Sequence, residues 1–468
     1  MGSSCSTLQH AAAHVRFGQK AVVIVPGMCS NALESKMEKK MSELWGENSF
    51  RTKVLDWWGG DSYHDWELSY VNVYETVVHS GRTFRSLALQ LEHGHLPTGE
   101  LVPTTSGLES EVRCVTGLDG IATLNPGELP PVKLWAPFID EFGNDYGLLP
   151  LNYDWRRWGD PVFAHEVLAD FQEHVETALR ISGQQVTLVA HSMGASVTLW
   201  CLSQLGDHWT QSYLEQVILC APAASGAPCM FPCYCNGPGG AVGLPVMKMM
   251  PLQSMDSAIA HITSSWPCMV AEFPVNVGGI QTYPPDRVFA SHKDKKYTIN
   301  DVDKFLQDVT IAYEKGSQLP NHAWKIGMEL WPYVKRMAAE MKAPPVPTHI
   351  IYSKSVPTIQ RVRYAEESMM EHPQIEEYEP GDDTITAASI EAMAEGWKRR
   401  GAFVALHPTP VEQKVNHQTA ISSPFSLKVI QNLLEGKDVV EGADVEMSDD
   451  EEDPNLVQRL KAMWHHYL

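Results

Sequence analysis

Several features are missing from this chain of 468 residues, and each absence excludes a class of protein or of binding partner. No apolar run approaches the ~18 to 20 residues that a membrane-spanning helix requires. No stripe of Lys and Arg is present to meet phosphate groups, and the net charge of −21 argues against a nucleic-acid partner. No Asn-x-Ser/Thr sequon occurs, and the nine cysteines follow no regular framework, as expected of free thiols in a reducing compartment.

The N-terminal segment 1–19 also lacks a long apolar run behind a basic start, so we expect no secretory signal peptide. It reads MGSSCS at its start, a pattern typical of N-myristoylation on Gly2, with Cys5 beside it as a palmitoylation site. One acyl chain holds a membrane only marginally, whereas two anchor stably. The segment therefore predicts a protein on the cytoplasmic face of a membrane. The alternative is an unmodified, disordered Ser-rich start.

The residues that are present describe a globular protein with ample core, because 44% are hydrophobic and 20% are charged. Buried strands and amphipathic helices alternate, which predicts an α/β fold with a mostly parallel sheet and helices on both faces. The expected strands cover residues 21–25, 148–156, 186–190, 216–221 and 348–353. The expected helices cover residues 133–142, 161–182, 301–315, 322–342 and 420–434.

This alternation predicts one domain over residues 20–435. Two stretches interrupt it: an irregular lid region at about 50–130, rich in Trp, Gly and Pro, and a cap insertion at about 224–345. The run of Asp and Glu within 436–468 predicts an acidic, solvated C-terminal tail.

A serine framed by small residues stands between an apolar strand and a helix in the run VTLVAHSMGAS, where Ser192 is the framed residue. Strand, sharp turn and helix in this order are typical of the nucleophile elbow of α/β-hydrolases, which lifts one hydroxyl above the strand ends. The neighbouring Ala190 and Gly194 leave room for the close approach of strand and helix. A buried serine that caps a helix would give the same local pattern.

The partners of such a serine follow in the order acid, then histidine. Asp382 and Asp383 lie in a turn after the predicted strand at 348–353, and spacing alone does not decide between them. His417 follows, just before a helical stretch, and would take the serine proton while the acid fixes its tautomer. His407 competes for this role, but the prolines around it indicate a surface turn.

With these motifs in place, the chain resembles the lecithin:cholesterol acyltransferase family, which includes lysosomal phospholipase A and phospholipid:diacylglycerol acyltransferase. The similar stretches keep the family's order across nearly the whole chain. They are residues 25–34, 153–156, 190–194, 265–267, 287–289, 297–305, 381–385 and 416–417.

The resemblance implies roles for individual residues. The family's catalytic acid is the first Asp after Gly in its Gly-Asp-x-Thr-Val motif, which is similar to Asp382 here. The backbone amides of Met28 and Met193 correspond to the family's oxyanion hole, and two convergent N–H groups are also what a developing oxyanion requires. Asp154 and Arg156 resemble a structural element that supports the site.

Trp57 and Trp58 are the candidates for contact with lipid or a membrane, and packing in a small core is their alternative role. No cysteine pair flanks them, so we do not expect the lid disulfide of the family's secreted members. The cysteines in the segment 229–235 lack the paired spacing of a structural zinc site, so we expect no metal and no cofactor.

These features together predict a serine acyltransferase or phospholipase A that moves a fatty-acyl group from a glycerophospholipid through an acyl-serine intermediate. The acceptor is a lipid hydroxyl, such as that of a sterol or diacylglycerol, or water. Sequence leaves this choice open, because the first half-reaction is the same. The alternative is a membrane-associated lipid-binding protein with a vestigial hydrolase site.

Overall fold

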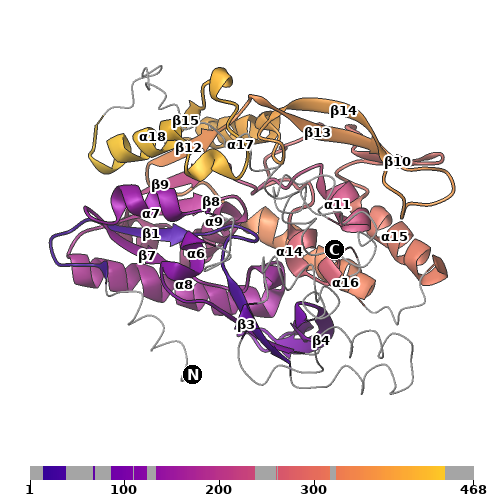
Figure 1. Cartoon of the computed structure of the whole chain (residues 1–468), viewed down its shortest axis with the longest axis horizontal. Helices are drawn as coiled ribbons and strands as arrows, with labels where there is room; N and C mark the ends of the chain where they lie inside the picture. The colour runs from indigo at the N-terminus through magenta and orange to yellow at the C-terminus, as the bar shows by residue number, and fades with distance from the viewer. Residues whose placement is uncertain are drawn as a thin grey trace, which may run out of the picture.

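The computed structural model describes residues 14–37, 67–68, 86–108, 110–123, 133–237, 260, 262–316 and 323–437. At their centre lies a six-stranded sheet in which every neighbouring pair of strands is parallel (Figure 1). In spatial order its strands are β15 (Val404–Pro408), β12 (Thr348–Tyr352), β9 (Leu214–Cys220), β8 (Val186–His191), β1 (Ala21–Val25) and β7 (Gly147–Pro150). The predicted α/β-hydrolase fold is confirmed.

The inner strands form because their side chains are apolar on both faces. All residues of β1 and β8 are buried, as parallel strands covered by helices on each side require. The predicted strands at 21–25, 186–190 and 348–353 therefore agree closely with β1, β8 and β12.

Helices connect and cover these strands: α7 (Ala136–Phe142), α8 (Pro161–Ser182), α9 (Met193–Leu205), α10 (Asp207–Tyr213), α17 (Ala387–Arg399) and α18 (Pro424–Leu434). Helices α8 and α9 connect strands that follow one another toward the β15 edge of the sheet. Helix α7 connects β1 to β7, toward the opposite edge. Since such crossovers are right-handed, α7 covers the face opposite α8 and α9. Helix α8 begins where the Asp160 carboxylate accepts the amides of Val162 and Phe163, and it ends at Gly183 with φ 74°.

The last helix is shorter than predicted. Residues 420–434 were expected to form one helix, but α18 begins only at Pro424, after the Ser423 hydroxyl accepts the amide of Ser426. Proline favours the first position of a helix and lacks an amide to continue an earlier one. The short 3₁₀ turn η5 (Thr419–Ile421) precedes it.

The prediction of irregular structure at about 50–130 was wrong for the part of that stretch that the structure describes. Strands β2 (Leu33–Met37), β3 (Glu67–Leu68) and β6 (Ser110–Cys114) form one antiparallel sheet, and β4 (Leu89–His95) pairs with β5 (Leu101–Gly107). A short helix, α6 (Asp119–Ala122), follows. These strands escape a search for apolar runs because they carry Glu, Ser, Thr, Gly and Pro, and several of their side chains are exposed.

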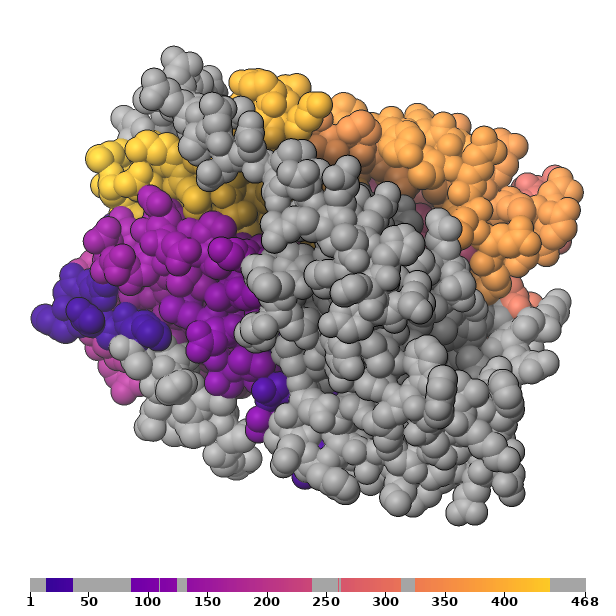
Figure 2. Space-filling view, viewed as in Figure 1, coloured from indigo at the N-terminus to yellow at the C-terminus, as the bar shows by residue number. Residues whose placement is uncertain are grey.

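Within the stretch predicted to form a cap, 224–345, the described residues form α11 (Met230–Asn236), α14 (Pro267–Ala271), α15 (Val302–Gly316) and α16 (Ala323–Glu340). A four-stranded sheet has the order β11 (Lys295–Tyr297), β10 (Ala290–His292), β13 (Val356–Arg363) and β14 (Gln374–Gly381). In Figure 2 the orange β13–β14 region lies beside the yellow C-terminal segments along one edge of the molecule. Short 3₁₀ turns occur at η2 (Trp155–Arg157) and η4 (Val411–Gln413). None of the helices in the described ranges combines the length and apolar composition needed to cross a bilayer.

Candidate active site

Ser192 occupies the turn between β8 and α9, with φ 57° and ψ −128°. A non-glycine residue in such a conformation costs about 1–3 kcal/mol, and it is tolerated here because the surrounding backbone fixes it. The turn is also crowded. A Cβ on Gly27 would lie 2.7 Å from the Ser192 Cβ, and one on Gly194 would lie 2.2 Å from the Val25 carbonyl oxygen. Only glycine fits at these two positions.

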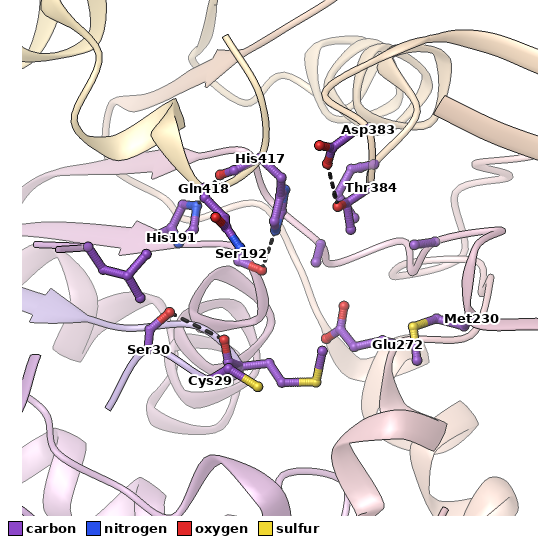
Figure 3. A pocket seen from close by; sticks show the side chains of 15 residues that line it. Cys29, Ser30, His191, Ser192, Met230, Glu272, Asp383, Thr384, His417 and Gln418 are labelled. Atoms are coloured by element: carbon purple, nitrogen blue, oxygen red, sulfur yellow. Dashed lines mark hydrogen bonds between the residues drawn. The ribbon is translucent and has the colours of Figure 1, made fainter. Parts of the chain in front are cut away.

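Three side chains that are far apart in sequence converge at this turn. The Nε2 atom of His417 lies 2.7 Å from the Ser192 Oγ (Figure 3), and its Nδ1 lies 2.9 Å from the Asp382 Oδ2. All three residues are buried. Ser192 follows β8, Asp382 follows β14, and His417 lies in the loop before α18. The arrangement is that of a nucleophile, a general base and the acid that orients the base.

Asp382 is held by backbone groups as well as by the histidine. Its Oδ1 accepts the amides of Thr384 at 3.0 Å and Ile385 at 2.6 Å, which leaves Oδ2 for His417. Asp383 has φ 76°, and its Oδ1 instead accepts the Thr384 hydroxyl at 2.9 Å. Of the two carboxylates that spacing alone did not separate, Asp382 is therefore the one in contact with His417.

His417 is also fixed through its own backbone. Its amide donates to the Asp382 carbonyl at 2.7 Å, and its carbonyl oxygen lies 2.8 Å from the His191 Nε2. Burial alone would lower the pKa of His417, but the charge and hydrogen bond of Asp382 outweigh this and raise the pKa.

His191 was not identified from the sequence as part of the site. Burial, followed by the proximity of His417, lowers the pKa of His191 to about 3. It is therefore a neutral ring whose Nε2–H donates to the His417 carbonyl. Its position directly before Ser192 is the only sequence signal for this supporting role.

The residues expected to supply the oxyanion hole lie on either side of Ser192. Met193 is the first residue of α9, where helix amides have no partner within the helix and the dipole favours negative charge. Met28 lies in the turn after β1 and lines the same pocket as Ser192. Their amides stay the predicted donors to an oxyanion.

Asp154 and Arg156 form a hydrogen-bonded network in the segment after β7. The Asp154 carboxylate accepts hydrogen bonds from the Nη2 of Arg156 at 2.6 Å and from the Nε of Arg156 at 2.8 Å. The Nη1 of Arg156 donates to the Leu87 carbonyl at 2.8 Å. The Trp266 indole donates to the same carbonyl at 2.7 Å. The pair therefore joins the segment after β7 to the residue Leu87, two positions before β4, and Trp266 binds the same carbonyl.

The pocket in front of Ser192 has about 690 Å³ of empty space, part of it open to solvent. Its wall is mainly apolar, with Leu134, Ala223, Ala227, Met230 and Ile385 among the lining residues. Such a wall suits an acyl chain.

A buried glutamate interrupts this wall. Glu272 lies immediately after α14, is 4% exposed, and directs its carboxyl group into the pocket on the side of Ser192 (Figure 3). Burial raises the pKa of Glu272 to about 8, so the carboxyl group is protonated at neutral pH. Sequence analysis missed this residue. Its only signal is a single acid among apolar neighbours in the segment 267–273.

The interpretation of His407 as part of a surface turn was wrong. It lies in β15, where it pairs with Ile351 of β12, and its Nε2 is 3.1 Å from the His349 Nδ1. Strand pairing outweighs the local preference of the flanking prolines, because Pro408 occupies the last position of the strand.

Four other predicted residues lie outside the described ranges, namely Gly2, Cys5, Trp57 and Trp58. Cys229, Cys233 and Cys235 are buried on or next to α11. No group of three or more His, Cys, Asp or Glu side chains in the described ranges is arranged to hold a metal ion.

Comparisons with a family model and with individual proteins point to the same family. The family model described as lecithin:cholesterol acyltransferase matches residues 97–428. A phosphatidylcholine-sterol acyltransferase from Gallus gallus is 26% identical over 248 residues, which is 53% of this chain and 53% of that protein. A lysosomal phospholipase A and acyltransferase from Canis lupus familiaris is 24% identical over 285 residues, 61% of this chain and 62% of that protein. The matches thus span less than two thirds of either relative.

Among solved structures, the Tle4-Tli4 complex covers 91% of this chain and 100% of its own at 10% identity, with a TM-score of 0.45. That likeness is too distant to support a functional argument.

Proposed function

The chain belongs to the lecithin:cholesterol acyltransferase family, and from this premise we propose that it transfers a fatty-acyl group from a glycerophospholipid to a lipid hydroxyl or to water. The observation that carries the proposal is the continuous hydrogen-bonded series from Ser192 through His417 to Asp382. A vestigial hydrolase site in a lipid-binding protein would have no reason to keep this series together with the strained elbow.

In the proposed reaction, the Ser192 Oγ attacks the ester carbonyl while the His417 Nε2 takes its proton. The amides of Met28 and Met193 stabilise the oxyanion of the tetrahedral intermediate. His417 then protonates the leaving lysophospholipid oxygen, which leaves the acyl group on Ser192. The acceptor hydroxyl then attacks the acyl carbon while His417 takes its proton. His417 gives that proton to the Ser192 Oγ as the acyl–serine bond breaks, which restores the free enzyme.

Analysis of products from a phospholipid with labelled acyl chains tests the proposal. The purified protein is incubated with labelled vesicles that contain no second lipid, a sterol, or diacylglycerol. Labelled fatty acid indicates transfer to water, and labelled sterol ester or triacylglycerol indicates transfer to the lipid alcohol. Release of no label under any of these conditions would favour the non-catalytic alternative.

The raised pKa of His417 predicts the acid side of the pH profile. The base must be neutral, so kcat/KM should fall as the pH drops through a pKa above the ordinary value of about 6.5. At about one pH unit below that pKa, roughly a tenth of the plateau activity should be left. Hydrolysis of a soluble short-chain ester from about pH 5 to 9 measures this. Full activity well below pH 6.5 would contradict the assignment of His417.

We further propose that residues 20–435 form the catalytic domain, with the lid region at about 50–130 and the cap at about 224–345 bordering the lipid-binding side. In this proposal Asp154 and Arg156 support the active-site turn, and Trp57 and Trp58 contact lipid. The segment 1–19 is the membrane anchor.

The anchor gives a prediction about location. In cells, Gly2→Ala should move the protein from the membrane to the soluble fraction, because the first acyl chain is lost. Cys5→Ser should weaken retention but leave transient binding, since one chain anchors only marginally. Ser4→Ala keeps the acylation pattern and is the matched control. Unchanged membrane association of the Gly2→Ala, Cys5→Ser double variant would contradict acylation and direct attention to Trp57 and Trp58.

A further inference from the structure

Glu272 lines the pocket, but the acyl-transfer steps above do not use its carboxyl group. Its Oε1 is buried and has no hydrogen-bond partner among the described residues. A buried polar atom without a partner is unfavourable, and Glu272 lines the pocket, where the polar group of a bound ligand can supply the missing hydrogen bond. The surrounding wall is apolar, so that ligand is a largely apolar molecule with a single polar group.

The titratable groups near Glu272 do not provide a charge that would stabilise its ionised carboxylate. The charge of Glu272 acts on two titratable groups, Cys268 on α14 and Tyr153 after β7. Burial raises the pKa of both, so they are uncharged. The Tyr153 hydroxyl already donates to the Pro26 carbonyl at 2.6 Å. Across the pocket, the other titratable lining groups are Cys29, His191, Asp383 and His417. Of these, only His417 readily gains a positive charge, because its pKa is raised, and its two ring nitrogens already contact Asp382 and Ser192. Burial is what sets the raised pKa of Glu272.

We propose that the Glu272 carboxyl group binds the hydroxyl of a lipid alcohol in this pocket and thereby favours the alcohol over water as the acyl acceptor. The inference rests on the proposed acyl transfer and concerns only its second half. A lipid alcohol has one polar group on an apolar body, which matches a protonated carboxyl group set among the apolar side chains of this wall. Water is abundant and reaches the acyl-serine without a dedicated contact.

The direction of the hydrogen bond matters for catalysis. The acceptor hydroxyl must give its own proton to the His417 Nε2, so Glu272 has to donate to the hydroxyl oxygen rather than accept from it. A protonated carboxyl group can donate in this way. An ionised one can only accept, and it would then compete with His417 for the proton that must be transferred. Transfer to the alcohol should therefore decline above about pH 8, whereas hydrolysis should not follow the same decline.

Two variants of the full chain test the proposal in vesicles of labelled phosphatidylcholine that contain diacylglycerol or a sterol. Glu272→Leu removes the polar contact, and we expect the ratio of transfer to hydrolysis to fall about tenfold. Total acyl release should stay within about threefold of the wild type. Glu272→Gln has an amide that donates at every pH, so transfer should persist above about pH 8, where the wild type loses it.

The control is Glu340→Gln, which changes another carboxylate, one that accepts the Trp200 indole and does not line the pocket. Labelling of Ser192 by a fluorophosphonate reports whether each variant is folded. If Glu272→Leu fails to fold, the pH dependence of transfer in Glu272→Gln still decides the question.

The outcomes separate the two proposals. A wild type that releases no acyl group at all refutes the proposed function, and the inference with it. A wild type that releases acyl groups but gives the same transfer ratio as Glu272→Leu refutes the role of Glu272 alone, as does a wild type that forms fatty acid and never an ester. Loss of acyl release in Glu272→Leu with an unchanged ratio would assign Glu272 to the phospholipid instead and overturn the proposal.

Discussion

The Ser192→Ala variant is expected to fold and to lose at least a thousandfold in acyl release. Alanine retains the Cβ that fits against Gly27 but has no oxygen to attack the ester or to accept the acyl group. Loss of a triad serine typically costs ~10⁴ to 10⁶ in kcat, and the oxyanion hole alone leaves a small residual rate. Labelled phospholipid hydrolysis under single-turnover conditions measures the loss.

Covalent labelling gives an independent measurement of the same assignment. A fluorophosphonate should modify the wild type at Ser192 and leave Ser192→Ala unlabelled. Ser196→Ala is the matched control, because Ser196 is buried one turn further along α9 and does not line the pocket. Labelling that persists at another serine in Ser192→Ala would mean that the nucleophile lies elsewhere.

The sequence was sufficient to predict the central sheet and the elbow because both depend on local patterns. Strands β1 and β8 are buried on both faces, so they read as mainly apolar runs without polar alternation, and the turn at Ser192 requires small residues at fixed offsets. The pairs β4–β5 and β13–β14 were missed because their strands mix charged, small and exposed residues. Their stability comes from pairing between strands rather than from either strand alone.

In the active site, too, the residues recognised from local sequence patterns were predicted, and those that depend on contacts between distant parts of the chain were missed. The order of Ser192, Asp382 and His417 could be read along the chain, because the fold fixes which strand ends carry them. The contact of His191 with the His417 carbonyl joins residues 226 positions apart, and no local pattern encodes it. Glu272 was missed for a related reason. A single glutamate in a short helical segment is usually exposed, whereas the tertiary structure directs this side chain into the pocket.

After Ser192→Ala, the largest loss of activity is expected for Asp382→Asn. This loss distinguishes the role of Asp382 from that of the adjacent Asp383. In Asp382→Asn the side-chain oxygen stays with the amides of Thr384 and Ile385, so its NH₂ group faces the His417 Nδ1. An NH₂ group there stabilises the tautomer that carries its proton on Nε2, and that tautomer cannot accept the proton of Ser192. We therefore expect kcat to fall by about 10⁴, as for the same substitution in other triads.

Asp383→Asn is the matched control, because it makes the same chemical change one residue later. Asparagine tolerates the left-handed backbone at φ 76°, so the turn should be preserved. The Asp383 charge contributes only weakly to the raised pKa of His417, after burial and Asp382, so its loss should move the acid side of the pH profile slightly downward. We expect kcat/KM to change by less than about tenfold. Equal losses in the two variants, or a greater loss in Asp383→Asn, would transfer the role of the acid to Asp383 and require the turn at 381–385 to rearrange when substrate binds.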